Sequence, residues 1–140
     1  MDCIFCKIVK GELPGERVYE TDKSVAILDL YPLNKGHVLV IPKKHYERLL
    51  EIPLEEFQDM IEVAYKVAQG IYHALNPDGY HLLMNNGKAS GQEIDHSHLH
   101  IIPRFSDDGI KFGWRHLKYE EEELKAYGEK LRQAIGSKEG

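Results

Sequence analysis

His96, His98 and His100 are the residues of this sequence best suited to chemistry. They stand at alternate positions in the apolar segment His96-Ser97-His98-Leu99-His100-Ile101-Ile102-Pro103. In a β-strand this spacing places the three imidazoles on one face and the intervening residues on the other. Imidazole titrates near neutral pH, so such a row can attack an electrophile, donate a proton or bind a metal ion. A single histidine in an apolar run is usually structural, whereas three on one face indicate a functional site.

Two cysteines stand three residues apart near the start of the sequence, as Cys3-Ile4-Phe5-Cys6. Reduced cysteines can serve simply as small apolar residues. A thioredoxin-type redox pair should follow a strand, and only two residues precede Cys3. A structural zinc site needs four ligands, which His45 and one histidine of the triad could complete. The spacing by itself leaves zinc binding and a purely structural role open.

Three other positions allow more than one interpretation. The loop Gly87-Lys88-Ala89-Ser90-Gly91-Gln92 could bring backbone N–H groups close to an anion, or it could be an ordinary hairpin connection. Its place directly before the histidine segment favours phosphate binding. Asp29 is either a turn-forming carboxylate or an acceptor for sugar hydroxyls, and the turn is favoured when the residue is taken singly. His37, taken by itself, is interpreted as structural.

Length and composition restrict the class of protein. A chain of 140 residues with two cysteines can bury a core without disulfides. We expect one domain over residues 1–136 and a frayed tail over 137–140. The net charge of -5 gives no general attraction to nucleic-acid polymers or anionic membranes. No apolar run approaches the ~20 residues of a membrane span, and the first residues do not begin a secretory signal, so a cytoplasmic protein is expected.

Five strands and two helices are expected to position the reactive residues. The strands are predicted over residues 17–20, 24–30, 37–42, 80–85 and 96–103, separated by turn residues. A long helix begins at Pro53, and its apolar residues repeat every three or four positions until Asn76-Pro77-Asp78-Gly79 ends it. A second helix is predicted from about Glu120 to Ile135. The pattern indicates an α+β fold, with an antiparallel sheet of about five strands, one long helix and a C-terminal helix.

These segments together resemble the histidine-triad (HIT) family of nucleotide hydrolases and transferases, in particular its zinc-containing bacterial and archaeal members. The matching pieces cover nearly the whole chain: Cys3 to Pro14, Ser24 to His45, Tyr80 to Gly91 and Gly91 to Arg104. The resemblance implies a HIT-like fold, a homodimer and a purine nucleotide substrate, with adenine the expected base. It also implies that Trp114 and the C-terminal segment reach toward the partner's site.

The resemblance also implies a catalytic mechanism. His98 matches the nucleophile, which attacks the α-phosphorus and forms a nucleotidyl-histidine that water then hydrolyses. His100 matches a phosphate contact that assists departure of the leaving group, while His37 and His96 order the imidazoles. The chemistry is consistent, because a neutral imidazole held by a backbone carbonyl at one nitrogen is a good nucleophile at the other.

Nucleotide contacts are implied in the same way. Asp29 matches the acceptor of the ribose hydroxyls; Asn85, Gly91, Gln92, Glu93, His98 and His100 match the phosphate side; and Phe5, Ile8, Ile27 and Leu28 match the apolar slot for the base. Glu93 departs from the family pattern, because many relatives carry Ser or Thr there. An acidic side chain would disfavour a polyanionic leaving group, or would donate a proton if its pKa were raised.

The resemblance favours structural Zn²⁺ as a cofactor. Some similar family members hold zinc through a pattern like Cys3, Cys6, His45 and His96, whereas others lack the second cysteine. Such a closed site would tie the N-terminus to the catalytic strand. His96 would then be a ligand, unavailable for acid–base chemistry.

The expected activity is hydrolysis of nucleoside 5′-phosphoramidates, adenylylated adducts or dinucleoside polyphosphates. Two alternatives remain open at this point. In the first, His96, His98 and His100 are ligands of a catalytic metal in a metal-dependent hydrolase or oxygenase. In the second, the protein is a non-catalytic nucleotide-binding module.

Overall fold

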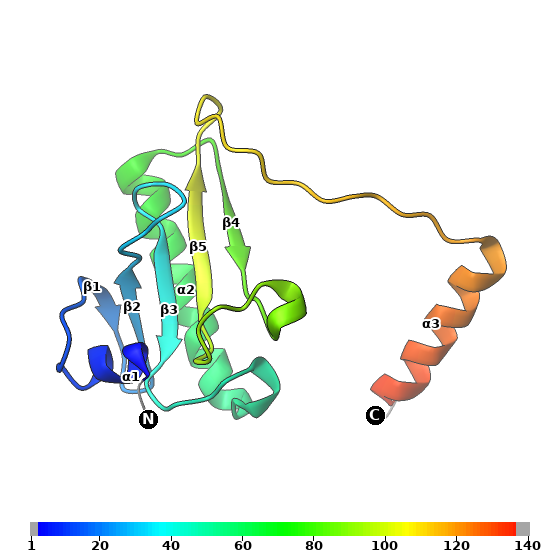
Figure 1. Ribbon diagram of the computed structural model, residues 1–140, viewed down its shortest axis with the longest axis horizontal. Coiled ribbons are helices and arrows are strands. Elements are labelled where there is room, and N and C mark those ends of the chain that lie inside the picture. Colours follow the sequence, from blue (N-terminus) through cyan, green and yellow to red (C-terminus); the bar gives the residue numbers. More distant parts are fainter. Residues whose placement is uncertain (1–2, 137–140) are drawn as a thin grey trace. The chain divides into compact units, whose positions relative to one another are not determined.

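The computed structural model describes residues 3–136, which belong to two compact units, Met1–Asp108 and Gly109–Gly140. Figure 1 labels the elements of the first unit. Its strands are β1 (Arg17–Glu20), β2 (Ser24–Leu28), β3 (Val38–Pro42), β4 (Gly79–Leu83) and β5 (Leu99–Arg104). Its helices are α1 (Ile4–Val9) and α2 (Leu54–Leu75), with single 3-10 turns at η1 (Leu49–Glu51) and η2 (Lys88–Ser90).

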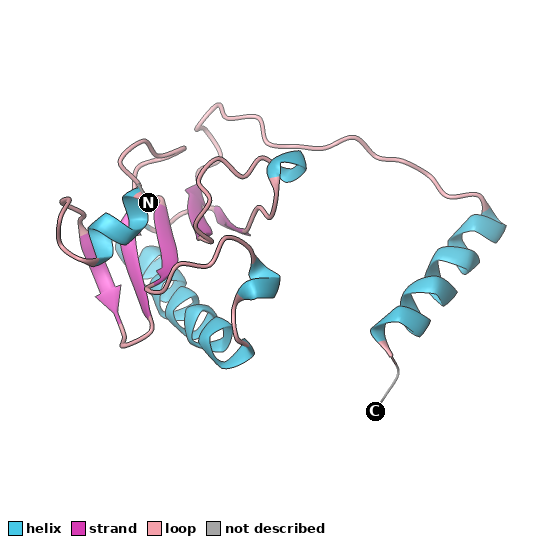
Figure 2. Ribbon diagram, turned by 60° about the horizontal axis from the view of Figure 1, so that its bottom comes forward, coloured by secondary structure: helices cyan, strands magenta, loops and turns pink. Residues whose placement is uncertain are grey.

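The five strands form one sheet in the order β1-β2-β3-β5-β4, and every neighbouring pair is antiparallel. Helix α2 covers one face and α1 the other (Figure 2). Alternate residues of β3 therefore serve two cores: Val38 and Val40 pack toward α2, while Leu39 and Ile41 pack toward α1. Burial on both faces explains why β2 and β3 read as continuous apolar runs. The predicted α+β fold is confirmed.

The long helix α2 forms as its sequence predicts. Pro53 is its N-cap, and Glu55 and Glu56 lie in the first turn, where carboxylates interact favourably with the helix dipole. Its buried stripe consists of Met60, Val63, Ala64, Val67 and Ile71. Asn76 ends the helix in the left-handed conformation, with φ of 51°. These buried residues of α2 form one core with Ala26, Val38, Val40, Leu99 and Ile101 of the sheet.

The histidine segment departs from the prediction at its N-terminal end. Strand β5 begins at Leu99, so His96 lies in a bend and His98 in the residues that lead into the strand. The reason is that the Ser97 N–H donates to the Tyr46 carbonyl at 2.7 Å rather than to a strand of the sheet. The strand's alternation is confirmed further along, since Leu99 and Ile101 pack toward α2.

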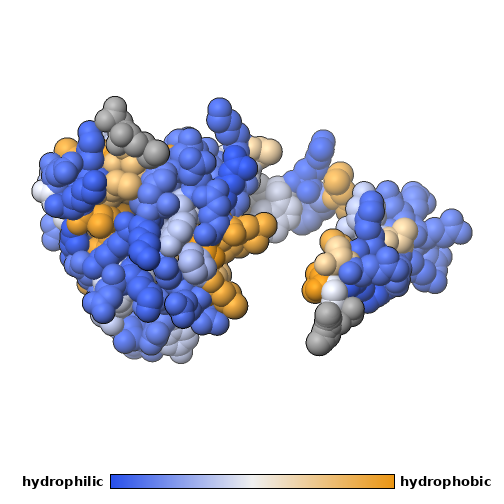
Figure 3. Space-filling view, turned by 90° about the horizontal axis from the view of Figure 1, so that it is seen from below, coloured by the Kyte–Doolittle hydropathy of each residue, from blue (hydrophilic) through white to orange (hydrophobic). Residues whose placement is uncertain are grey.

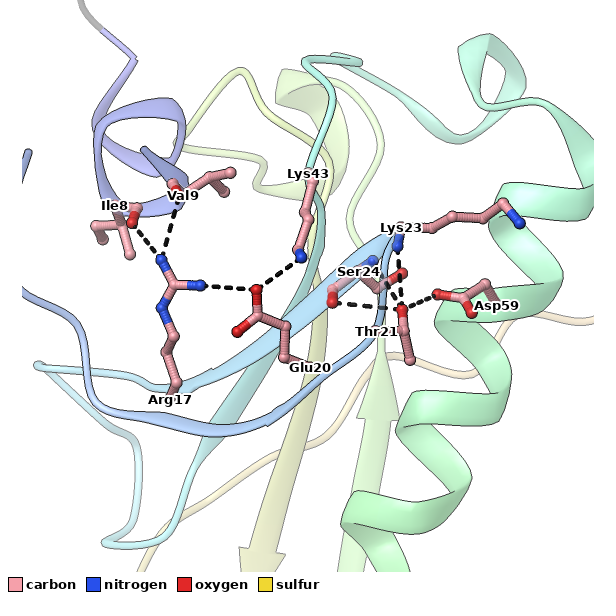
Figure 4. A network of polar contacts seen from close by, with 9 residues as sticks. All are labelled: Ile8, Val9, Arg17, Glu20, Thr21, Lys23, Ser24, Lys43 and Asp59. Atoms are coloured by element: carbon pink, nitrogen blue, oxygen red, sulfur yellow. Dashed lines mark hydrogen bonds and ion pairs between the residues drawn. The ribbon is translucent and has the colours of Figure 1, made fainter. Parts of the chain in front are cut away.

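Helix α1 was not expected from the sequence, and a cationic side chain holds its end in place. Arg17 on β1 donates through Nη2 to the carbonyls of Ile8 and Val9, at 2.8 and 3.2 Å (Figure 4). The other side of its guanidinium pairs with Glu20, which also pairs with Lys43 of the segment after β3. Both cations lower the pKa of Glu20 by hydrogen bonding to its carboxylate. Arg17 thus adds a side-chain donor to the carbonyls at the end of α1, where the helix provides fewer backbone partners.

The second unit contains one helix, α3 (Glu121–Ile135), close to the predicted range of 120–135. Glu120 and Glu123 form a reciprocal capping box at its start, and Gly136 ends it with φ of 81°. Residues 109–120 contain no helix or strand. The predicted tail over 137–140 lies outside the described residues. The single domain expected over 1–136 stays a prediction.

The surface is largely hydrophilic, with apolar patches (Figure 3). Over residues 3–136 the structure contains no helix with the length and hydrophobicity needed to cross a bilayer. Exposed aromatic and aliphatic side chains include Tyr65 and Tyr72 of α2 and Tyr80 and Leu82 of the edge strand β4. The cytoplasmic location and the homodimer stay predictions.

Replacing Gly36, which precedes the site residue His37, should destabilise the fold. Its φ is +98°, and an added Cβ would lie 2.4 Å from Leu75 Cδ1. We expect Gly36→Ala to lower the free energy of unfolding by about 1–3 kcal/mol, measured by urea denaturation. Gly79→Ala is the matched control, because no atom lies within 4 Å of its added Cβ. Equal midpoints for the two variants would contradict this account of Gly36.

Candidate active site and metal cluster

A cavity of about 440 Å³ lies on the α1 face of the sheet and contains most of the predicted site residues. Its lining includes, from the predicted set, Phe5, Asp29, His37, Asn85, Gly91, Glu93, His98 and His100. A second cavity, of about 470 Å³, lies on the α2 side and offers no histidine or carboxylate. The chemistry of the lining therefore places the candidate site in the first cavity.

His98 is held in one tautomer by a backbone carbonyl. Its Nδ1 lies 2.8 Å from the carbonyl oxygen of His96. Since a carbonyl only accepts, Nδ1 carries the proton and the lone pair is on Nε2. The residue is 7 % exposed, and the ring of Phe5 meets it edge-on at 5.3 Å. The imidazole is thus oriented, and in its neutral form the lone pair on Nε2 is the one free to attack an electrophile.

A second chain of hydrogen bonds fixes His37 and His100. The Leu33 N–H donates to His37 Nδ1 at 3.1 Å, so the proton of neutral His37 is on Nε2. That nitrogen lies 2.9 Å from His100 Nδ1 and donates to it. The proton of His100 is therefore on Nε2, where it can be donated to an oxygen in the cavity. His37, interpreted from sequence as structural when taken singly, orients a cavity histidine.

Burial keeps both of these imidazoles neutral at physiological pH. Desolvation, together with the nearby His98 and His37, lowers the pKa of His100 to about 4, and the carboxylate of Asp29 partly opposes this shift. The pKa of His37 is also lowered by burial, partly offset by the carboxylate of Asp29. At neutral pH these two histidines therefore act as hydrogen-bond donors and not as cations.

Asp29 forms a turn, and its carboxylate also lines the cavity. Its Oδ1 accepts the Tyr31 N–H at 2.9 Å, which forms the turn after β2. Its Oδ2 lies 3.6 Å from His37 Nε2, and the carboxylate lines the cavity. The turn therefore presents an acceptor beside the histidines.

Gln92 positions the glycine-bordered loop over residues 87–92. Several backbone N–H groups of this loop already have partners within it. The amides of Ser90, Gly91 and Gln92 donate to carbonyls inside the loop, and Gly87 N–H donates to Gln92 Oε1. Gln92 is buried, and its Nε2 donates to the carbonyls of Glu47 and Ile94. Of the predicted phosphate contacts, Gln92 does not line the cavity, whereas Asn85, Gly91 and Glu93 do.

The predicted base slot is only partly assembled. Phe5 lines the cavity, whereas Ile8 and Ile27 are buried in the core between α1 and the sheet. Leu28 lies on the opposite face, in the lining of the other cavity, because alternate residues of β2 point to opposite faces. This placement corrects the prediction for Leu28. The apolar lining comes instead from residues that sequence reasoning missed: Leu39, Leu83, Ile94 and Ile102.

Cys3, Cys6, His45 and His96 converge in a separate cluster. His96 Nε2 donates to the Pro42 carbonyl at 2.8 Å, so the lone pair of its Nδ1 faces the cluster. That nitrogen lies 3.2 Å from Cys3 Sγ, 3.6 Å from Cys6 Sγ and 3.2 Å from His45 Nδ1. Cys6 Sγ lies 3.4 Å from His45 Nδ1. His96 is therefore committed to this cluster and is absent from the cavity lining.

The donor set and its spacing fit a tetrahedral metal site. Zinc bonds of about 2.0–2.3 Å require ligand atoms about 3.3–3.8 Å apart, close to the observed separations of 3.2–3.6 Å. The triad nitrogens themselves do not form such a group among the described residues; the other group with metal-ligand spacing is Asp29, His37 and His100. In that group His37 and His100 are hydrogen bonded to each other.

Taken together, the two-sided antiparallel sheet and the histidine-lined cavity agree with a protein of the histidine-triad type. A family model for the HIT domain matches residues 10–107, more than half of the sequence. The chain therefore belongs to the HIT family. A relative described as adenosine 5′-monophosphoramidase, from Schizosaccharomyces pombe, is 42 % identical over 96 % of this chain and 99 % of its own.

Solved structures agree with this membership. A HIT family protein from Bacillus subtilis superimposes with a TM-score of 0.91 at 36 % identity, covering 98 % of this chain and 99 % of its own. A Zn-bound histidine triad family protein from Mycobacterium smegmatis has a TM-score of 0.75 at 38 % identity, covering 96 % and 98 %. The fold and the sequence thus point to the same family.

Acid should destabilise the protein through its buried imidazoles. The unfolded chain protonates His100 near pH 6.5 but the folded chain only near pH 4, so the unfolded state binds more protons between these values. Stability is then complete above about pH 6.5 and is lost as the pH falls toward 4. We expect His100→Asn to lose less stability than the wild type between pH 7 and pH 5, measured by urea denaturation.

His73→Asn is the control for this measurement, since His73 is an exposed residue of α2. It should keep the wild-type dependence on pH. An identical loss of stability in His100→Asn and in the wild type would show that burial of His100 does not set the acid sensitivity.

Proposed function

We propose that this protein is a nucleotidyl hydrolase that forms a covalent intermediate at His98 and releases a nucleoside monophosphate. The observation that carries the proposal is the bond from His98 Nδ1 to the His96 carbonyl, which leaves Nε2 as the nucleophile of a histidine-lined cavity. The relative described as an adenosine 5′-monophosphoramidase supports an adenosine 5′-phosphoramidate as substrate.

The first step exchanges one bond at phosphorus for another. His98 Nε2 bonds to the α-phosphorus, and the bond between phosphorus and the leaving group breaks. The leaving group takes the electron pair, and an amine leaving group also takes a proton from solvent. Because the imidazole is already oriented, little reorganisation accompanies the attack.

His100 and Asp29 bind the rest of the substrate. The Nε2–H of neutral His100 donates to a phosphate oxygen, where charge develops during the transfer. The carboxylate of Asp29 accepts from the ribose hydroxyls. Water then bonds to phosphorus, the bond to His98 breaks, and the nucleoside monophosphate leaves with His98 restored.

We also propose that Cys3, Cys6, His45 and His96 hold Zn²⁺. The four ligands fill a tetrahedral coordination shell, so the metal would be structural and would not contact substrate. The Zn-bound neighbour supports this assignment. The ion would tie α1 to the residues that lead into β5, and so would hold the carbonyl that orients His98.

A homodimer is part of the same proposal. Strand β4 is an edge of the sheet, and the exposed Tyr80 and Leu82 on it are accompanied by Tyr65 and Tyr72 of α2. Exposed apolar side chains beside an unpaired strand edge are typical of an association surface.

Replacing the nucleophile should abolish turnover without abolishing binding. We expect His98→Asn to lower kcat for adenosine 5′-phosphoramidate by at least about 10³-fold, measured by release of AMP. Calorimetric titration should show AMP binding within about tenfold of wild type. His81→Asn, at a residue outside the cavity lining, is the control and should retain activity.

Near wild-type activity in His98→Asn would overturn the nucleophile assignment. A non-catalytic binding module would show no turnover even in the wild type. A catalytic metal held by the triad would predict that chelation stops turnover of protein that circular dichroism shows to be still folded.

The zinc assignment predicts the metal content of purified protein. We expect one Zn²⁺ per chain in the wild type and less than about a fifth of that in Cys3→Ser and Cys6→Ser, because oxygen replaces a thiolate ligand. Plasma emission spectrometry measures the content directly. Ser97→Ala, at a buried neighbour of His96 that is no ligand, is the control. Unchanged stoichiometry in the cysteine variants would refute the site.

A further inference from the structure

Glu93 lies on the wall between the catalytic cavity and a neighbouring one. It lines the cavity that contains His98 and His100. Together with Ile94 it also lines an adjoining cavity of about 480 Å³, whose other lining residues are Cys3, Ile4, His45, Glu47 and Asp95. A group leaving the phosphorus bound to His98 therefore has a neighbouring space available past the carboxylate of Glu93.

The backbone that presents Glu93 is held firmly. The preceding residue, Gln92, is buried and donates to the carbonyls of Glu47 and Ile94, at 2.7 and 3.0 Å. Its Oε1 accepts the Gly87 N–H at 2.7 Å. These three bonds hold the backbone on both sides of Glu93. The position from which its side chain extends at the wall of the catalytic cavity is therefore fixed.

Three carboxylates lie on this wall: those of Glu93, Glu47 and Asp95. Among residues 3–136, no ion pair joins Glu93, or the neighbouring Glu47 and Asp95, to a lysine, arginine or histidine. A substrate whose leaving group extends along this wall therefore meets three carboxylates that have no ion-pair partner among the described residues. All three carboxylates are exposed to solvent, so their effect on a remote charge is modest and falls as the ionic strength rises.

We propose that Glu93 selects the leaving group by its charge, favouring phosphoramidates of amines that carry a second, cationic group over those that carry an anionic group. This inference rests on the proposed function, and it adds the class of substrate. In the transfer step His98 Nε2 forms a bond to phosphorus and the P–N bond breaks. The departing nitrogen keeps the electron pair of that bond and receives one proton from solvent. Glu93 takes no part in these bonds, and acts on the remote charge.

Three adenosine 5′-phosphoramidates of similar length test the proposal. Their amines are propane-1,3-diamine, 3-aminopropanol and 3-aminopropanoate, so the remote group is cationic, neutral or anionic. The measured quantity is the ratio of kcat/KM for the cationic substrate to that for the anionic one. We expect this ratio to exceed 1 in the wild type and to fall at least about threefold in Glu93→Gln. In Glu93→Lys it should fall further.

Glu62→Gln, at an exposed residue of α2, is the matched control and should keep the wild-type ratio. The inference is overturned if Glu93→Gln and Glu93→Lys both keep the wild-type ratio. It is also overturned if Glu93→Gln slows all three substrates equally, which would indicate a proton donor. If the wild type hydrolyses none of the three, the proposed function fails; hydrolysis of the neutral substrate with an unchanged ratio rejects only the role of Glu93.

Discussion

The hydrogen bond from His98 Nδ1 to the His96 carbonyl is the constraint on which the site depends. It works because His96 is itself immobilised: Nε2 donates to the Pro42 carbonyl, and Nδ1 faces two cysteines and His45. The following amide, Ser97 N–H, donates to the Tyr46 carbonyl. His98, the proposed nucleophile, therefore has its lone pair oriented before any substrate binds, which would remove part of the entropic barrier to the proposed reaction.

The small helix α1 shows how distant parts of the sequence are combined to build this site. A six-residue helix is not stable by itself in water. Here Phe5 and Ile8 pack against the sheet, and Arg17 caps the helix carbonyls. Cys3 and Cys6 meet His96 at its other end. The same helix brings Phe5 against His98, so the metal cluster and the catalytic cavity share one support.

Much of this arrangement can be predicted from the sequence, and the exceptions have physical reasons. Helical periodicity revealed α2, because this helix buries one regular face. Strand β5 was predicted to begin too early in the sequence. The Ser97 N–H donates to the Tyr46 carbonyl and not to a neighbouring strand, so the strand begins only at Leu99, after His96 and His98. Leu28 was assigned to the wrong face of the sheet, because the sequence does not show which residues of β2 point toward α2. Helix α1 was missed because a residue 93 positions away, His96, helps to hold it.

The central claim is that His98 itself becomes nucleotidylated. Rapid acid-free quenching of the protein during turnover of adenosine 5′-phosphoramidate, followed by peptide mapping with mass spectrometry, tests it directly. The account predicts an AMP adduct on the peptide containing His98, assigned to that side chain by fragmentation, which appears before AMP and disappears as substrate is exhausted. Turnover with an adduct on His100, or with the same adduct in His98→Asn, would contradict it.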